Sequence, residues 1–487
     1  MFNKLKELTK DTAVYGISTM VGRFLTFLLV PFYTNVFLPA EYGVIGNLYI
    51  FIAIFNIFLL YGMDAAYLKF AGMSKNVDEN DLFSTPYLSV FLVSLIISVA
   101  IILFKTPIYV ALVVPASYYN LIYLVASILF VDSLCVIPFI KLRLERKAKK
   151  FVFFKLTNII VNVSLNLFLI LKLKWGIEAV FVSNLAASFV AFLLLSPTII
   201  KSLKFKIQIN LLKRLLRFGL PYFPAGLAGM LIQGIDRPIL TYLTDLRTSG
   251  IYNANYKLGI FMMLFVNMFQ YAWQPFFLQN ASEKNAKEIF SKVLTYFTLI
   301  AAGILIVISL FIDNIVQIPI YQGHAIINPL YWSGLNIVPI ILLGYMFNGM
   351  YQIFSAGIFI KEKSIYVPII TSIGAIVNIA LNFLLIPLIG ITGAAFATLA
   401  SYLVMAIGYF AVTQKFYKIN YEYDKIGKIF LSVFIVGIIY YTQLIGGHLN
   451  LGNKFLMLLL FVILLGILKI GKEEISFLKK RLLKKRT

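Results

Sequence analysis

The residues of this sequence that could do chemistry are ionisable side chains inside long apolar segments. Asp236 and Arg237 are adjacent in one such segment, and Lys257 lies in the next. Arg23 lies about 16 Å into the first apolar segment at 1.5 Å per residue, which is near mid-membrane. A charge at the centre of a membrane helix costs about 2.5–3.5 kcal/mol, so such residues usually face a bundle interior or a wet cavity. Three cations and one carboxylate predict a site for an anionic substrate, in which Asp236 tunes the cations.

A second interpretation of the same charges needs no ligand. Asp236 could pair with Arg237, or with Lys257, and so lock two helices together. Two further carboxylates are weaker candidates, because Asp64 is near the end of its segment and Asp132 could pair within the bundle. The sequence allows both the binding and the locking interpretation.

Asparagine and glutamine side chains form a second polar set. Asn162 and Asn166 are four residues apart, as are Asn378 and Asn382, so each pair falls on nearly one helix face. Such amides either form hydrogen bonds between membrane helices or line a polar cavity that suits sugars. The amide candidates for a central cavity are Asn162, Asn166, Asn378, Asn382 and Gln233.

The composition identifies an integral membrane protein. Of 487 residues, 61% are hydrophobic and 13% are charged, against about 25% charged in soluble proteins. The net charge of +23 does not indicate nucleic-acid binding, because Lys and Arg concentrate in short segments between apolar runs. The single cysteine, Cys135, excludes a disulfide framework, and the motifs of metalloproteases, serine hydrolases and P-loop enzymes are missing from the sequence. We therefore expect no enzyme activity, no cofactor and no metal site.

Apolar segments long enough to cross a membrane recur along the whole chain. A span needs about 20 apolar residues, and the sequence predicts about fourteen spans, among them 12–37, 218–243 and 250–277. Basic clusters such as 141–155 and 201–217 fall on one side together with the basic chain ends, so the positive-inside rule puts both termini in the cytoplasm. These clusters set the topology and attract anionic headgroups, or they form a docking surface for a cytoplasmic partner.

An internal repeat divides the chain into halves. The asparagine pattern around Asn162 recurs around Asn378 at a shift of about 216 residues, as in transporters built from parallel repeats. We therefore predict an all-α integral membrane protein with two six-helix pseudo-repeat lobes plus a C-terminal helix pair. The expected divisions are an N-terminal lobe (1–200), a basic amphipathic linker (201–217), a C-terminal lobe (218–415), and the extra helix pair with a basic cytoplasmic tail (416–487).

Three sequence patterns, in this order and spacing, are typical of one superfamily. They are PAEYG at 39–43, Asp236 followed by GIYNANYK at 250–257, and NIALNFLLIPLIGITGAA at 378–395. With these patterns the chain resembles the polysaccharide transporters of the multidrug/oligosaccharidyl-lipid/polysaccharide exporter (MOP) superfamily, the group that includes O-antigen and capsule repeat-unit flippases. In the related lipid II flippases, central-cavity arginines and an extra helix pair for the lipid tail are thought to matter. Arg23 matches the first-helix arginine of that branch by position.

The resemblance implies a flippase. Its expected substrate is an undecaprenyl-pyrophosphate-linked oligosaccharide repeat unit, moved across the bacterial cytoplasmic (inner) membrane by alternating access, for O-antigen (lipopolysaccharide), capsule or exopolysaccharide synthesis. A pyrophosphate suits Arg and Lys, and a sugar suits amides and aromatic rings. The expected partners are this lipid-linked oligosaccharide and membrane lipids, with a glycan polymerase, glycosyltransferases and a coupling ion as further candidates.

The C-terminal helix pair offers a place for the prenyl chain. It lies outside the internal repeat and has few polar groups. We expect it to flank a lipid groove that opens toward the central cavity, or else simply to pack against the second lobe. The expected groove residues are Phe434, Ile438, Leu456 and Leu460.

Two other functions are alternatives. A multidrug or cation exporter of the same superfamily would place unpaired carboxylates in its cavity, whereas the charges predicted here are mainly cationic. A membrane glycan polymerase or ligase would need a large outer loop with catalytic residues. The longest outer loop, 313–331, is short and poor in acid–base groups.

Overall fold

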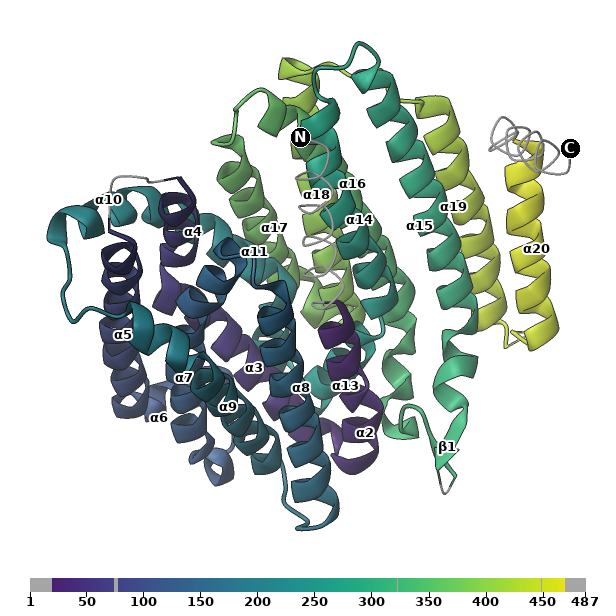
Figure 1. The fold of residues 1–487 in the computed structure, drawn as a ribbon. Coiled ribbons are helices and arrows are strands. Elements are labelled where there is room, and N and C mark those ends of the chain that lie inside the picture. Colours follow the sequence, from purple (N-terminus) through teal and green to yellow (C-terminus); the bar gives the residue numbers. More distant parts are fainter. Residues whose placement is uncertain (1–19, 74–77, 322, 448, 469–487) are drawn as a thin grey trace, which may run out of the picture. The chain divides into compact units, whose positions relative to one another are not determined.

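The computed structural model describes residues 20–73, 78–321, 323–447 and 449–468, and most of them are helical (Figure 1). Within these residues, eleven helices are long and apolar enough to cross a membrane, and two shorter apolar helices, Met20–Val36 and Leu451–Ile467, accompany them. The predicted all-α membrane fold is confirmed, and the chain is a multi-pass membrane protein. The start of the first predicted span and the basic chain ends lie outside the described residues.

The chain forms two compact units. Unit one contains the residues up to Leu258 together with Ile327–Ile337 and Ser364–Met405. Unit two contains Gly259–Ile326, Val338–Lys363 and the residues from Ala406 onward. The predicted lobes, linker and helix pair stay predictions.

Unit one is built almost entirely from helices. Its elements are α2 (Leu29–Val36), α3 (Pro39–Leu60), α4 (Met63–Met73), α5 (Glu79–Leu103), α6 (Lys105–Leu112), η1 (Ala116–Tyr118), α7 (Leu121–Leu144), α8 (Ala148–Leu171), α9 (Glu178–Ser202), α10 (Ile209–Gly219), η2 (Leu220–Tyr222), α11 (Phe223–Gly234), α12 (Asp236–Leu243), α13 (Leu246–Lys257), η3 (Pro329–Ile337), α17 (Tyr366–Ile389) and the start of α18 (Ile391–Phe416).

Small residues allow the helices of unit one to approach closely. Helix α7 packs between α5 and α9. Ser133 on α7 donates a hydrogen bond to Ser94 on α5 at 2.7 Å, and both side chains are fully buried. On α9, Ala187 and Ala191 are buried. Small and hydroxyl side chains are the usual contacts between membrane helices, because lipid provides no hydrophobic drive for association.

The structure corrects two of the predicted spans. The segment 250–277 is not one helix: α13 ends at Lys257 and α14 begins at Ile260, with a turn at Leu258 and the poor helix former Gly259 between them. The segment 218–243 is divided into η2, α11 and α12, and a proline stands at the start of both η2 and α11, where its missing N–H costs no helical hydrogen bond.

The basic stretch 201–217 contains helix α10. Leu211 and Leu215 are buried in the cluster of apolar side chains that α4 and α5 also supply, whereas Lys213 and Arg214 are exposed. The helix is therefore amphipathic, and its apolar face is covered by protein.

Unit two contains fewer helices. They are α14 (Ile260–Asn280), α15 (Ala286–Gln317), α16 (Val338–Ile360), the end of α18, α19 (Tyr423–Ile445) and α20 (Leu451–Ile467), with a short antiparallel hairpin of β1 (Pro319–Tyr321) and β2 (His324–Ala325). Helices α15, α19 and α20 pack on one another (Figure 1). The buried Lys454 of α20 donates hydrogen bonds to Asp313 and, at 2.6 Å, to the Asn314 side-chain oxygen, both on α15. This ion pair anchors α20 to α15.

Candidate functional site

Asp236 and Arg237 lie in a packed polar cluster at the start of α12. The exposed fraction is 0% for Asp236 and 5% for Arg237. The Tyr252 hydroxyl donates a hydrogen bond to the Asp236 carboxylate, and a guanidinium nitrogen of Arg237 lies 3.5 Å from the other carboxylate oxygen. The Thr398 hydroxyl lies 3.5 Å from Asp236. This carboxylate thereby ties α12, α13 and α18 together.

The Arg237 guanidinium also has several partners within the protein. Its Nε donates to the Asn253 side-chain oxygen at 2.9 Å, and another nitrogen donates to the Gln233 carbonyl at 3.0 Å. The guanidinium carbon lies 4.5 Å from the centre of the Tyr256 ring. The Gln233 side chain itself is exposed. These contacts favour the helix-locking interpretation of the pair, and an anion-binding role for it stays a prediction.

Lys257 has a different environment. Its ammonium donates to the Tyr42 hydroxyl at 3.0 Å, and its side chain lines a cavity of about 280 Å³. The same cavity is lined by Tyr33, Tyr49 and Asn162. The structure thus brings two of the predicted site residues, Lys257 and Asn162, together.

A second cavity of unit one shares lining residues with the first. It has a volume of about 450 Å³, and Asn158 and Asn184 line both cavities. Its charged lining residues are Asp64, Asp132, Arg143 and Lys155. We call the two cavities together the polar tract.

Helix α8 supplies one wall of the polar tract. Lys155, Asn158 and Asn162 follow one another at spacings of three and four residues, which places them on one helix face. The Lys155 ammonium lies 4.3 Å from the centre of the Phe139 ring. Sequence reasoning assigned Lys155 to a basic cytoplasmic cluster and so missed it. The signal that could have found it was its register with Asn158 and Asn162.

The two asparagine pairs have the same internal geometry. The Asn166 amide donates to the Asn162 carbonyl at 2.9 Å and to its side-chain oxygen at 3.0 Å. The Asn382 amide donates to Asn378 in the same way, at 2.8 and 3.0 Å. Asn166, Asn378 and Asn382 are fully buried, so of the four only Asn162 lines the polar tract.

Arg23 is exposed on the first described helix and does not line either cavity, although Thr26 on the same helix lines the smaller one.

The predicted groove residues lie on the surface of unit two. Phe434 is 65% exposed, Leu456 is 64% exposed, Ile438 is also exposed and Leu460 is half-buried. A role of Arg23 in binding, and a groove between α19 and α20, stay predictions.

Comparison with known proteins places the chain in a family. A family model described as "Polysaccharide biosynthesis protein" matches residues 36–322. The chain belongs to this family. The matched part of this polysaccharide biosynthesis protein includes every residue that lines the polar tract except Thr26, Leu29, Val30 and Tyr33.

One relative by sequence is an uncharacterised membrane protein of Methanocaldococcus jannaschii. It is 29% identical over 238 residues, which are 47% of this chain and 44% of that protein. The match therefore spans less than half of the relative's length.

Solved structures share the fold. The lipid II flippase MurJ in an inward closed conformation has a TM-score of 0.75 at 17% identity, over 95% of this chain and 100% of that one. An inward-facing multidrug resistance MATE family transporter of the MOP superfamily has a TM-score of 0.67 at 13% identity, over 81% of this chain and 94% of that one. This polysaccharide biosynthesis protein therefore shares its fold with these two transporters, as the resemblance of its sequence patterns predicted.

Proposed function

We propose that this polysaccharide biosynthesis protein is a flippase for undecaprenyl-pyrophosphate-linked oligosaccharide repeat units. It moves them across the bacterial inner membrane by alternating access and serves O-antigen, capsule or exopolysaccharide synthesis. The family description and the fold shared with a lipid II flippase support a transporter of this class.

The polar tract is the observation that carries the proposal. It combines three cations (Arg143, Lys155 and Lys257) with asparagine amides and tyrosines inside a membrane unit. A pyrophosphate has many acceptor oxygens and pairs with Lys and Arg, and sugar hydroxyls pair with amides and pack on aromatic rings. Each cavity is of the order of the 300 Å³ or more of a small-molecule site, so in this conformation the tract suits a headgroup and its first sugars.

The prenyl chain would remain in contact with lipid. The exposed apolar side chains of α19 and α20, including Phe434 and Leu456, offer it a surface that needs no polar partner. The repeat unit would cross in water while the tail stays in the membrane, which is the least costly division of such a substrate.

A second candidate is export of organic cations. Asp64 and Asp132 also line the polar tract, and carboxylates are the groups that would hold a cation there. The cations of the same tract oppose this function, because an incoming positive charge would meet Lys155 and Arg143 as well.

The test is a transport assay in proteoliposomes with a fluorescent polyprenyl-pyrophosphate glycan. We expect Lys155→Gln to lower the initial rate about tenfold, the effect of one lost charge-assisted hydrogen bond. Lys150→Gln is the matched control, because Lys150 is exposed on the same helix and does not line the tract. Equal initial rates for the two variants would show that the polar tract does not bind the transported glycan. Uptake of an organic cation dye by the wild-type protein, without glycan transport, would favour the cation exporter.

A further inference from the structure

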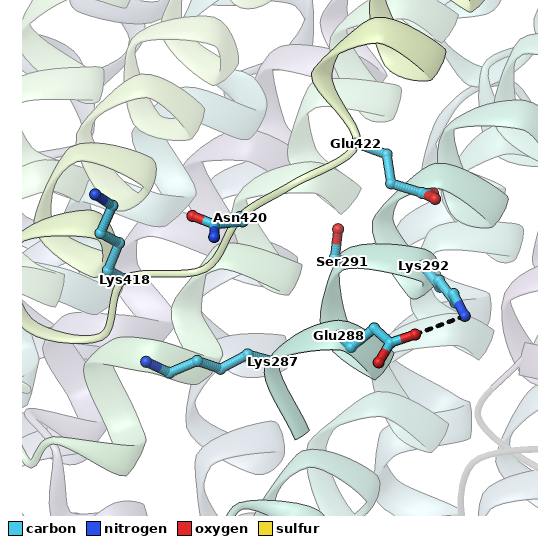
Figure 2. Close-up of a pocket in the computed structure, with 7 residues that line it drawn as sticks. All are labelled: Lys287, Glu288, Ser291, Lys292, Lys418, Asn420 and Glu422. Atoms are coloured by element: carbon cyan, nitrogen blue, oxygen red, sulfur yellow. Dashed lines mark hydrogen bonds and ion pairs between the residues drawn. The ribbon is translucent and has the colours of Figure 1, made fainter. Parts of the chain in front are cut away.

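Unit two contains a polar pocket of about 600 Å³ that shares no residue with the polar tract. Two segments line it, the start of α15 and the connection between α18 and α19 (Figure 2). Both segments are rich in lysine, so the positive-inside rule places them on the cytoplasmic side. The lining residues are Lys287, Glu288, Ser291, Lys292, Lys418, Asn420 and Glu422.

Both carboxylates of the pocket are already paired. Glu288 accepts from Lys292 at 2.9 Å, and Glu422 accepts from Lys425 at 2.8 Å. The Thr295 hydroxyl donates a further bond to Glu422 at 2.6 Å. Burial opposes ionisation of Glu422, but the bonds from Lys425 and Thr295 outweigh it and hold the pKa of this carboxyl below its ordinary value.

Two lysines are left as excess positive charge. Neither Lys287 nor Lys418 forms an ion pair with any residue that the structure describes. The Lys287 ammonium lies 5.0 Å from the centre of the Tyr417 ring, and Lys361 lies 5.9 Å from the same ring. The pocket therefore has the electrostatic character of an anion site.

The Ser291 hydroxyl is a second indication of a ligand, and it does not depend on the charge of the pocket. Its side chain is 3% exposed, lines the pocket, and its hydroxyl has no hydrogen-bond partner among the described residues. A buried hydroxyl without a partner costs about 1–3 kcal/mol. Ser291 lies in the second turn of the 32-residue helix α15, near the end whose dipole favours anions. Figure 2 shows its hydroxyl directed toward the connection that contains Asn420 and Glu422.

We propose that this pocket binds a phosphate group on the cytoplasmic side of the membrane. A phosphate offers three or more acceptor oxygens, which match the two unpaired lysines, the Ser291 hydroxyl and the Asn420 amide better than a carboxylate does. The phosphate is the headgroup of an anionic phospholipid or part of a soluble cytoplasmic compound. Because the pocket lies in unit two, the proposal does not depend on the substrate proposed for the polar tract.

Two binding experiments on the purified full-length protein distinguish the sources. Native mass spectrometry counts the phosphatidylglycerol molecules that the protein retains from nanodiscs of phosphatidylglycerol and phosphatidylcholine. Isothermal titration calorimetry in detergent measures the affinity of the protein for inorganic pyrophosphate. We expect the double variant Lys287→Gln/Lys418→Gln to lose at least about tenfold in affinity for the probe that binds, and Ser291→Ala to weaken it as well.

The matched control is Lys284→Gln/Lys415→Gln, which removes the same charge from exposed lysines that do not line the pocket. Loss of phosphatidylglycerol in the pocket variant alone supports the proposal with a lipid source. Loss of pyrophosphate binding in the pocket variant alone supports it with a soluble source. If the pocket and control variants bind both probes equally, or the wild-type protein binds neither, the proposal is wrong.

Discussion

Gly43 and Gly250 lie backbone to backbone where α3 and α13 pack together. A Cβ on Gly43 would lie 3.2 Å from the amide nitrogen of Gly250, and a Cβ on Gly250 would lie 2.9 Å from that of Gly43. The two glycines belong to the patterns PAEYG and GIYNANYK, which are therefore the two sides of one helix contact. Tyr42 and Tyr252, from the same patterns, are fully buried beside it.

Replacing Gly250 with alanine is expected to destabilise unit one. The new methyl group would meet the Pro39 carbonyl oxygen at 1.7 Å, and backbone cannot move aside as a side chain can. Overpacking of this kind costs about 1–3 kcal/mol or more. Thermal unfolding in detergent, followed by fluorescence size-exclusion chromatography, should show a lower midpoint. Gly303→Ala is the control, because nothing lies within 4 Å of a Cβ there. Similar midpoints for the two variants would contradict the close contact.

Asp236→Asn and Arg237→Gln test whether the buried pair locks helices. Each change leaves a buried partner uncompensated, which typically costs about 3–5 kcal/mol, so both single variants should give little folded protein. The double variant should recover part of the loss, since no lone charge remains. Folded protein is measured by size exclusion and transport by the proteoliposome assay. Normal folding of Arg237→Gln with abolished transport would instead favour the anion site.

Single-cysteine mapping tests the orientation of the chain. In a Cys135→Ser background, Lys147→Cys should react with a membrane-impermeant maleimide only from the cytoplasm, and Ser117→Cys only from outside. Ser117 precedes α7 and Lys147 follows it, and α7 is one of the helices long enough to span the membrane. Reaction of both cysteines from the same side would overturn the predicted topology. The background needs only this one replacement, because Cys135 is the single cysteine of the sequence.

The proposed prenyl surface is tested by Leu456→Gln. Leu456 is 64% exposed, so the change should leave unit two folded and slow transport of a prenyl-linked glycan several-fold by making the tail's path polar. Met457→Gln is the contrasting variant: Met457 is buried, and its change should reduce folded protein. A normal transport rate for folded Leu456→Gln would show that the tail does not use this surface.

Long apolar runs were enough to predict the fold class, an all-α membrane protein, but they did not predict how segments 218–243 and 250–277 divide into shorter helices. Which side chains contact one another was harder to predict. Asp236, Arg237 and Lys257 have similar predicted depth, but their hydrogen-bond partners differ: Asp236 accepts from Tyr252, Arg237 donates to Asn253, and Lys257 donates to Tyr42. Likewise, the sequence predicted one helix over 250–277, although its first part, up to Lys257, is mainly polar and forms the separate helix α13.

The asparagine pairs of α8 and α17 form the same two hydrogen bonds, which bears on the origin of the two halves of the chain. If the two halves arose by duplication, as the predicted repeat implies, both asparagine pairs would have inherited this one bond pattern. Their surroundings differ. In the first pair the Tyr33 hydroxyl, which lines the polar tract, donates to the Asn166 side-chain oxygen at 2.8 Å. The equivalent oxygen of Asn382 is buried and meets no donor among the described residues. The two asparagine pairs thus have the same internal bonds but different neighbours. Exchanging the side chains around one pair for those around the other is therefore expected to change stability or transport.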